Sequence, residues 1–150
     1  MSHPGPRARV LVARCLPTRR TGGWRRCWCW GPTSRAAEKI ADPREAFESV
    51  LRGYLEAAEG DAAFQLALMG SIDLEWEGLA QHKAEFGEVV SRIIDRAVAS
   101  GQVRDDLTFA DFPMLACGVI STMYFRPAGN SDWRRHLQIV LDGTRAEEPE

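Results

Sequence analysis

Apolar residues recur at helical spacing between residues 42 and 142 and divide this stretch into about five helices. The first helix is the best marked. Asp42 suits the N-cap, Pro43 the first helical position, and Glu45 the third position after the cap. No segment alternates apolar and polar residues over the length of a strand. The pattern therefore predicts an all-α fold, an antiparallel bundle of about five helices.

The middle of the chain leaves two helical arrangements open. A short apolar segment covers residues 62–69. Apolar positions then continue at helical spacing from 72 to 98, either as one long helix or as two helices joined near Gly78 or Gly87. In both arrangements the pattern ends at Gly101.

Two further helices are expected after a polar connector at residues 102–107. Thr108 and Asp111 form a second capping box, which predicts the start of an apolar helix. Ser131 is predicted to cap a last helix that ends near Gly143.

The chain changes character near residue 40. It has 150 residues and a formal net charge of −2, enough for one globular domain with a core. Residues 1–40 hold nine Lys or Arg against one acidic residue, a net charge of +8, and residues 41–150 hold ten against twenty, a net charge of −10. We expect residues 1–33 to form a disordered basic segment rich in Trp and Cys, 34–145 to form the folded domain, and 146–150 to be an acidic tail.

Composition excludes several classes of protein. No run approaches the roughly 18 uncharged apolar residues that a membrane span needs. The first residues contain no apolar stretch typical of a secretory signal, and four cysteines do not make a disulfide framework. We therefore expect a cytoplasmic protein that does not associate with membranes.

The folded part offers little for catalysis. His82 and His136 have no His or Cys partner at metal-binding spacing, and no Gly-rich phosphate loop is present, so neither a metal nor a cofactor is predicted. Cys117 lies on an apolar helix face, where a cysteine is usually a small buried hydrophobe. The four glutamates that could pair at helical spacing are typical of a solvated face: Glu75, Glu77, Glu85 and Glu88. We predict that the protein is not an enzyme and has no catalytic residues.

A binding role has more support. Aromatic residues and methionines between helices can line an adaptable apolar pocket. The candidate pocket residues are Phe64, Leu68, Trp76, Phe86, Met114, Cys117 and Tyr124. The alternative is that these side chains only pack the core, and spacing alone does not separate the two.

Three blocks of sequence carry a family resemblance. They are Asp-Pro-Arg-Glu-Ala-Phe at 42–47, the helix end and connector at 97–108 followed by Asp111, and the closing block at 133–143. In this order and spacing, residues 42–145 resemble the C-terminal domain of TetR-family transcriptional regulators of the SbtR-like type.

The resemblance implies an effector-binding and dimerisation domain. An unknown apolar small molecule would enter among the central helices, and the last two long helices, at about 109–125 and 132–142, would form a four-helix bundle in a homodimer. Ligand binding would then shift the spacing of two DNA-binding heads. The interface residues implied are Met114, Gly118, Ser121, Trp133, Leu137, Val140 and Leu141.

Residues 1–40 depart from the family pattern. The family carries a helix-turn-helix before this domain, and residues 1–40 do not resemble one. Only residues 34–41 resemble the end of the helix that links head and effector domain. We therefore expect specific DNA binding to be lost in this chain, with operator DNA a partner only if an intact helix-turn-helix is restored.

We hypothesise that much of residues 1–33 is read in a shifted frame, which would explain the excess of Arg, Pro, Gly, Trp and Cys there. If residues 24–30 are encoded TGG AGG CGG TGC TGG TGC TGG, reading from the third base gives Glu-Ala-Val-Leu-Val-Leu, a good helical segment. Two alternatives are a genuine basic arm that contacts nucleic acid and a zinc site. The zinc site is disfavoured because Cys27 and Cys29 are too close in sequence and Cys15 and His3 are remote. For the whole chain, the alternative function is a helical dimerisation or interaction protein without a ligand.

Overall fold

The computed structural model describes residues 30–59, 79–124 and 132–147. These residues form five helices: α2 (Trp30–Glu38), α3 (Pro43–Glu59), α5 (Leu79–Ala99), α6 (Asp111–Tyr124) and α7 (Trp133–Gly143). Apart from one isolated bridge between Val103 and Arg145, the described part contains no β-structure. The all-α prediction is confirmed.

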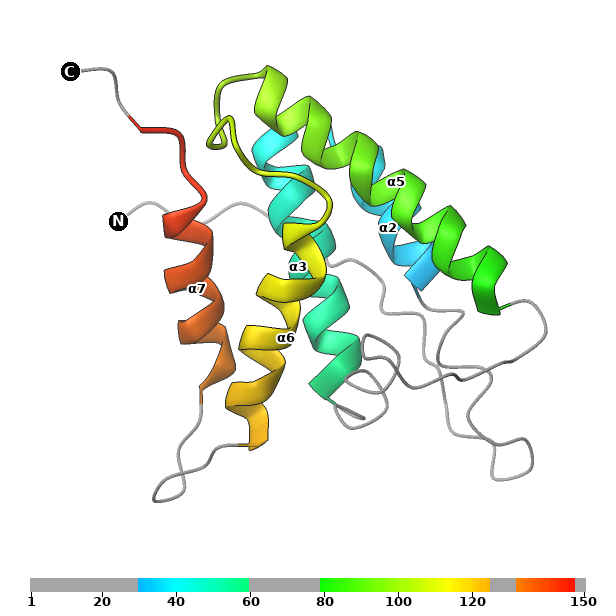
Figure 1. Ribbon diagram of the computed structural model, residues 1–150, viewed down its shortest axis with the longest axis vertical. Helices are drawn as coiled ribbons and strands as arrows, with labels where there is room; N and C mark the ends of the chain where they lie inside the picture. Colours follow the sequence, from blue (N-terminus) through cyan, green and yellow to red (C-terminus); the bar gives the residue numbers. More distant parts are fainter. Residues whose placement is uncertain (1–29, 60–78, 125–131, 148–150) are drawn as a thin grey trace, which may run out of the picture.

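Helix α3 is the centre of the bundle. Figure 1 shows α2 and α5 on one side of it and α6 followed by α7 on the other. The buried face of α3 repeats at helical spacing and consists of Ala46, Phe47, Val50, Leu51, Tyr54, Leu55 and Ala58. This apolar stripe places α3 between two helix pairs because it buries residues against both.

The start of α3 matches its sequence signals. The Asp42 carboxylate accepts a hydrogen bond from the Glu45 amide at 2.7 Å, and the Asp42 carbonyl accepts one from the Ala46 amide at 3.0 Å. Gln102 Oε1, from the connector after α5, accepts a hydrogen bond from the Arg44 amide at 3.0 Å. Pro43 has no amide hydrogen, so these contacts satisfy the otherwise unpaired donors of the first turn.

Helix α5 runs without interruption through Gly87, so two helices joined at that residue are excluded. A Cβ atom at Gly87 would lie 3.2 Å from the ring of Phe109, which packs over the glycine from the connector. The helix ends before Gly101, whose φ of +71° is the left-handed conformation that favours glycine. The predicted segment at 62–69 and the alternative junction at Gly78 lie outside the described residues.

The last two helices confirm one predicted cap and correct another. The Asp111 carboxylate accepts hydrogen bonds from the amide and hydroxyl of Thr108, at 2.8 and 2.9 Å, and the bond from the amide is one half of the predicted capping box. The Asp111 amide donates to the Thr108 carbonyl at 3.1 Å and not to its hydroxyl. Helix α7 is capped by Asp132, which accepts a hydrogen bond from the Arg134 amide at 3.1 Å, and not by Ser131. Both residue types are good caps, so sequence alone assigned this one a single position too early.

Helix α2 lies against α3 and α5. Ala37 and Ser34 are fully buried, and a Cβ atom at Gly53 of α3 would lie 2.5 Å from Thr33 Cγ2. The predicted boundary between residues 33 and 34 therefore falls inside α2, which begins at Trp30. None of the described helices combines the length and apolar character needed to cross a membrane.

Candidate functional site

Three aromatic rings meet where α3, α5 and α6 converge. The ring centroids of Tyr54, Phe86 and Phe112 lie 5.7 to 5.9 Å apart, with Phe112 edge-on to both others. Tyr54 and Phe112 are buried, whereas Phe86 is only half-buried. The cluster therefore presents one aromatic side chain, that of Phe86, at the border of the core.

Among the predicted pocket residues, Phe86 is the one that lies in this cluster. Cys117 is half-buried on α6, and burial raises the pKa of its thiol, which fits a small buried hydrophobe. Met114 is 65% exposed and lies on the outer surface instead of in the aromatic cluster. Tyr124 is the last residue of α6, and its side chain is not among the described ones. Phe64, Leu68 and Trp76 lie outside the described residues.

Sequence reasoning did not place Tyr54 and Phe112 at the candidate site. Both occupy regular apolar positions, and nothing in their local spacing distinguishes them from ordinary core residues. Their meeting depends on how α3 packs against α6, which residues 58 positions apart do not reveal.

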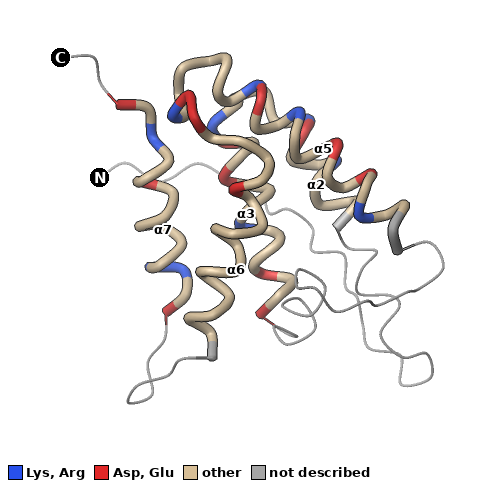
Figure 2. The backbone as a smooth tube through the Cα atoms, in the orientation of Figure 1, with Lys and Arg blue, Asp and Glu red and all other residues tan. Residues whose placement is uncertain are grey.

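Helix α6 presents an uncharged outer face. After Asp111 it contains no Lys, Arg, Asp or Glu, and Figure 2 shows the helix in tan from there almost to its end. Met114 and Gly118 are exposed on it, and a Cβ atom at Gly118 would meet nothing within 4 Å. Ile139 of the neighbouring α7 is 55% exposed. We refer to these three exposed positions, Met114 and Gly118 of α6 and Ile139 of α7, as the open face.

The predicted interface residues divide into two groups. Trp133, Leu137 and Leu141 are buried within the chain itself, because they hold α7 to the rest of the bundle. They have almost no surface left for a second subunit, so their position in a single chain is a core position. Ser121 and Val140 are half-buried, whereas Met114 and Gly118 remain open. Sequence reasoning missed Ile139, although it lies between two buried leucines and therefore on the opposite face.

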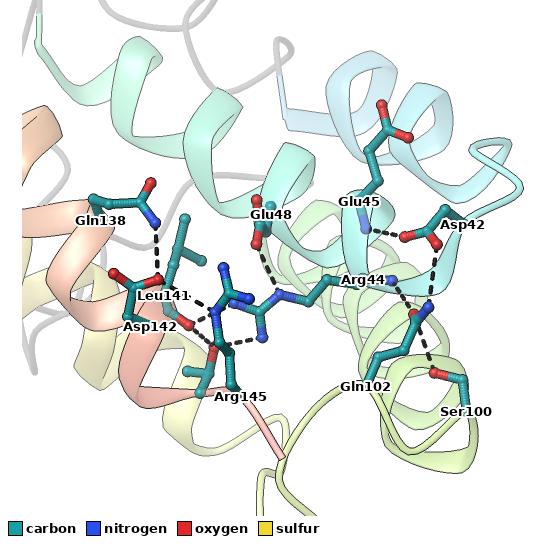
Figure 3. A network of polar contacts seen from close by, with 11 residues as sticks. Asp42, Arg44, Glu45, Glu48, Ser100, Gln102, Gln138, Leu141, Asp142 and Arg145 are labelled. Atoms are coloured by element: carbon teal, nitrogen blue, oxygen red, sulfur yellow. Dashed lines mark hydrogen bonds and ion pairs between the residues drawn. The ribbon is translucent and has the colours of Figure 1, made fainter. Parts of the chain in front are cut away.

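A polar network joins three segments at one end of the bundle (Figure 3). At its centre is Arg44, whose side chain is only 13% exposed. Its Nη2 donates to the Leu141 carbonyl at 2.5 Å, its Nη1 to Thr144 Oγ1 at 3.1 Å, and its Nε to Glu48 Oε1 at 2.7 Å. The guanidinium of α3 thus supplies donors and positive charge to the C-terminal end of α7.

The same end of the bundle holds the C-terminal end of α2. Arg96 of α5 donates to the carbonyls of Glu38 and Ile40 at 3.2 and 2.8 Å. Arg92 pairs with the Glu38 carboxylate at 2.7 Å, and this hydrogen bond holds the pKa of Glu38 below its ordinary value. Carbonyls at a helix end need such partners, so α5 fixes where α2 ends.

Gln102 connects the contacts around Arg44 with those at the C-terminal end of α2. Its Nε2 donates to Asp42 at 3.2 Å, and its Oε1 accepts hydrogen bonds from the Arg44 amide and from Ser100 Oγ. The hydrogen bonds from the Glu45 amide and from Gln102 keep the pKa of Asp42 below its ordinary value. The turn between α2 and α3 is therefore held by the connector that follows α5.

The opposite end of α7 is tied to α3 as well. Arg134 pairs with Glu59 at 3.1 Å, and this hydrogen bond lowers the pKa of Glu59. The Arg134 guanidinium also lies 4.3 Å from the ring centroid of Trp133. In the described part of the chain, no three His, Cys, Asp or Glu side chains converge to form a metal site.

The helical bundle with its terminal helix pair is consistent with the regulatory domains of TetR-type proteins. A family model described as the C-terminal domain of SbtR-like transcriptional regulators matches residues 42–146, more than two thirds of the chain. The chain belongs to this family. A search of curated proteins with this sequence finds no match.

Proposed function

We propose that residues 34–145 act as the small-molecule-sensing and homodimerising domain of a transcriptional regulator. Family membership supports the regulatory role. The observation that carries the dimer is the open face, where Met114 and Ile139 are exposed beside an uncharged helix. A second copy would bury these exposed apolar side chains, and the uncharged part of α6 can meet its own copy across a two-fold axis without like-charge repulsion.

Helix α7 also suits pairing with a second copy. Arg135, Ile139 and Asp142 follow one another at spacings of four and three, so they lie on one exposed helix face. In an antiparallel pairing around Ile139, Arg135 of one subunit faces Asp142 of the partner subunit, and the reverse pair forms at the other end. Opposite charges at the two ends therefore favour self-association in this orientation.

The dimer is tested by sedimentation equilibrium of the full chain. Ile139→Glu places a charge at the centre of the proposed interface and is expected to raise the dimer dissociation constant by at least about tenfold. The matched control is Ala84→Glu, which adds the same charge at an exposed position of α5. Equal dissociation constants for the two variants, or a monomeric parent chain, would reject the proposed interface.

For the ligand, we propose an apolar small molecule that contacts Phe86 in the aromatic cluster. A screen of apolar compounds by thermal shift tests this, because a ligand at a hundred times its dissociation constant adds about 2.7 kcal/mol of stability. Phe86→Ala is expected to abolish the response, and Met114→Ala, on the outer surface, to preserve it. A chain that dimerises and responds to no compound is instead an interaction protein.

We also expect these 150 residues to lack specific operator binding, because residues 1–40 do not resemble a helix-turn-helix. A gel shift with DNA from upstream of the gene tests this expectation. Weak binding that falls steeply with added salt would come from the basic segment alone. Tight, sequence-specific binding that persists at high salt would contradict it.

A further inference from the structure

The polar network has a consequence beyond holding the fold together. We propose that Arg96, Gln102 and Arg44 couple the C-terminal end of α2 to the C-terminal end of α7, so that displacing α2 loosens α7. Arg96, Gln102 and Arg44 act as positioning residues, since each fixes where another segment lies. The regulatory use of this coupling rests on the proposed function, in which α7 belongs to the dimer interface.

The contacts form a continuous path. Arg96 holds the carbonyls of Glu38 and Ile40 at the end of α2. Two residues further along the chain, Asp42 accepts a hydrogen bond from Gln102 at 3.2 Å. Gln102 in turn accepts a hydrogen bond from the Arg44 amide at 3.0 Å, so the turn and the first residues of α3 move as one unit.

Arg44 extends the path to α7. Its guanidinium contacts Leu141 and Thr144, 97 and 100 residues away in sequence. Thr144 is buried and donates through its hydroxyl to the Leu141 carbonyl at 2.7 Å. The Thr144 carbonyl accepts a hydrogen bond from the Arg104 amide at 3.1 Å, so the connector that carries Gln102 also holds the end of α7. Figure 3 shows the Arg44 side chain reaching toward Leu141, and Gln102 beside Asp42.

Two features make this end of α7 sensitive to the network. Helix α7 packs chiefly against α6, and α2 makes its main contacts with α3 and α5. The apolar core therefore connects α2 and α7 only through intermediate helices, whereas the polar path connects them through four side chains, those of Arg96, Asp42, Gln102 and Arg44. Polar contacts are directional and are lost after small displacements, which allows the end of α7 to respond to a shift of the turn.

The experiment measures hydrogen exchange of the full chain, peptide by peptide. Arg96→Gln removes the guanidinium that binds the Glu38 and Ile40 carbonyls, and leaves the Arg92–Glu38 pair in place. We expect about tenfold faster exchange both at residues 36–42 and at residues 139–146, which Arg96 does not contact. Arg96→Lys, which keeps one donor for the carbonyls, is expected to restore exchange at 139–146 in part.

Two further variants separate coupling from general loosening. Gln102 is exposed, so Gln102→Ala should fold, and in this background Arg96→Gln is expected to change exchange at 36–42 only. Arg134→Gln removes the tie at the other end of α7 and is expected to leave 36–42 unchanged. Faster exchange confined to residues 36–42 in Arg96→Gln, or an equal rise in every peptide, would overturn the proposal.

The same variants distinguish this proposal from the proposed function. Hydrogen exchange reports on contacts within one chain, so the coupling can be observed whether or not the chain dimerises. A monomeric chain in which Arg96→Gln still loosens residues 139–146 would reject the proposed dimer and retain the coupling. If the chain dimerises and Arg96→Gln leaves hydrogen exchange at residues 139–146 unchanged, the proposed function is retained and the coupling is rejected.

Discussion

The guanidinium of Arg44, in the first turn of α3, donates a hydrogen bond of 2.5 Å to the main-chain carbonyl of Leu141 in the last turn of α7. This contact joins the two ends of the described domain across 97 residues of sequence. It places a positive charge at a helix C-terminus, where the aligned carbonyls favour a cation. Arg44 therefore determines where α7 ends relative to α3, and substitutions at this position test that role directly.

Arg44→Met keeps most of the packed stem and removes the donors to Leu141, Thr144 and Glu48. Because the side chain is mostly shielded from water, we expect a loss of about 1–3 kcal/mol in the free energy of unfolding. Arg134→Met is the matched control, since its pair with Glu59 is about half exposed and should contribute less than about 1 kcal/mol. Urea unfolding at fixed protein concentration measures both. Equal losses would mean that Arg44 contributes no more than a surface ion pair.

Gly53 tests the close approach of α2 to α3. Alanine is the better helix former, by about 1 kcal/mol, so Gly53→Ala would stabilise an isolated helix. A Cβ atom there would lie 2.5 Å from Thr33 Cγ2, and we expect the clash to displace α2 and lower stability instead. Gly118→Ala has open space and is expected to raise the stability of the monomer. Thermal unfolding at several protein concentrations compares the two. If Gly53→Ala also proves stabilising, α2 does not pack as described.

Local signals predicted the individual elements of this fold well. The start of α3 was predicted from Asp42, Pro43 and Glu45, and the start of α6 from Thr108 and Asp111. Both predictions rest on residues that are close together in the sequence. The apolar spacing gave the buried face of α3 for the same reason. At α7, Ser131 and Asp132 are adjacent and chemically similar, so local sequence did not decide between them.

The candidate site depends on contacts between distant residues, and these were predicted less well. Phe86 was expected near a ligand, but its neighbours Tyr54 and Phe112 come from other helices and have no local signature. Trp133 and Leu137 share an apolar helix face, and such a face would be expected both in a core and in a dimer interface. Both side chains are buried within the single chain, so this face belongs to the core. Arg44 was noted only within a sequence block, because its partners lie about a hundred residues away.

The capping carboxylates predict how stability depends on pH. Hydrogen bonds from the Thr108 amide and hydroxyl lower the pKa of Asp111, and hydrogen bonds from the Glu45 amide and Gln102 lower that of Asp42. A pKa that is lower in the folded state means that folding favours the charged form. This stabilisation is complete above the ordinary value of 3.8 and is lost as the pH falls through the lowered value.

We therefore expect the free energy of unfolding to fall as the pH drops below about 4. Asp111→Asn keeps an oxygen acceptor for the cap and removes the titrating charge, so its stability should fall less steeply over this range. The control is Asp105→Asn, an exposed residue of the connector outside both capping boxes. Urea unfolding at a series of pH values measures the slopes. Parallel curves for the parent chain and Asp111→Asn would contradict a contribution from this cap.

Charge reversal on α7 tests the orientation of the proposed dimer. Arg135 and Asp142 are both exposed. Asp142 contacts Gln138 and Arg145 of its own chain, but these are surface contacts, so substitutions at both positions should leave the fold of the single chain intact. In an antiparallel pairing, Asp142→Arg faces Arg135 of the partner subunit with a like charge, and we expect a dissociation constant raised about three- to tenfold at low salt. Adding Arg135→Asp restores opposite charges and is expected to recover most of the affinity. A parallel pairing would place each residue against its own copy. The parent chain and the double variant would then both carry two like-charged pairs across the interface. Sedimentation at low and high salt distinguishes the two orientations, because added salt weakens the antiparallel dimer of the parent chain and strengthens the parallel one.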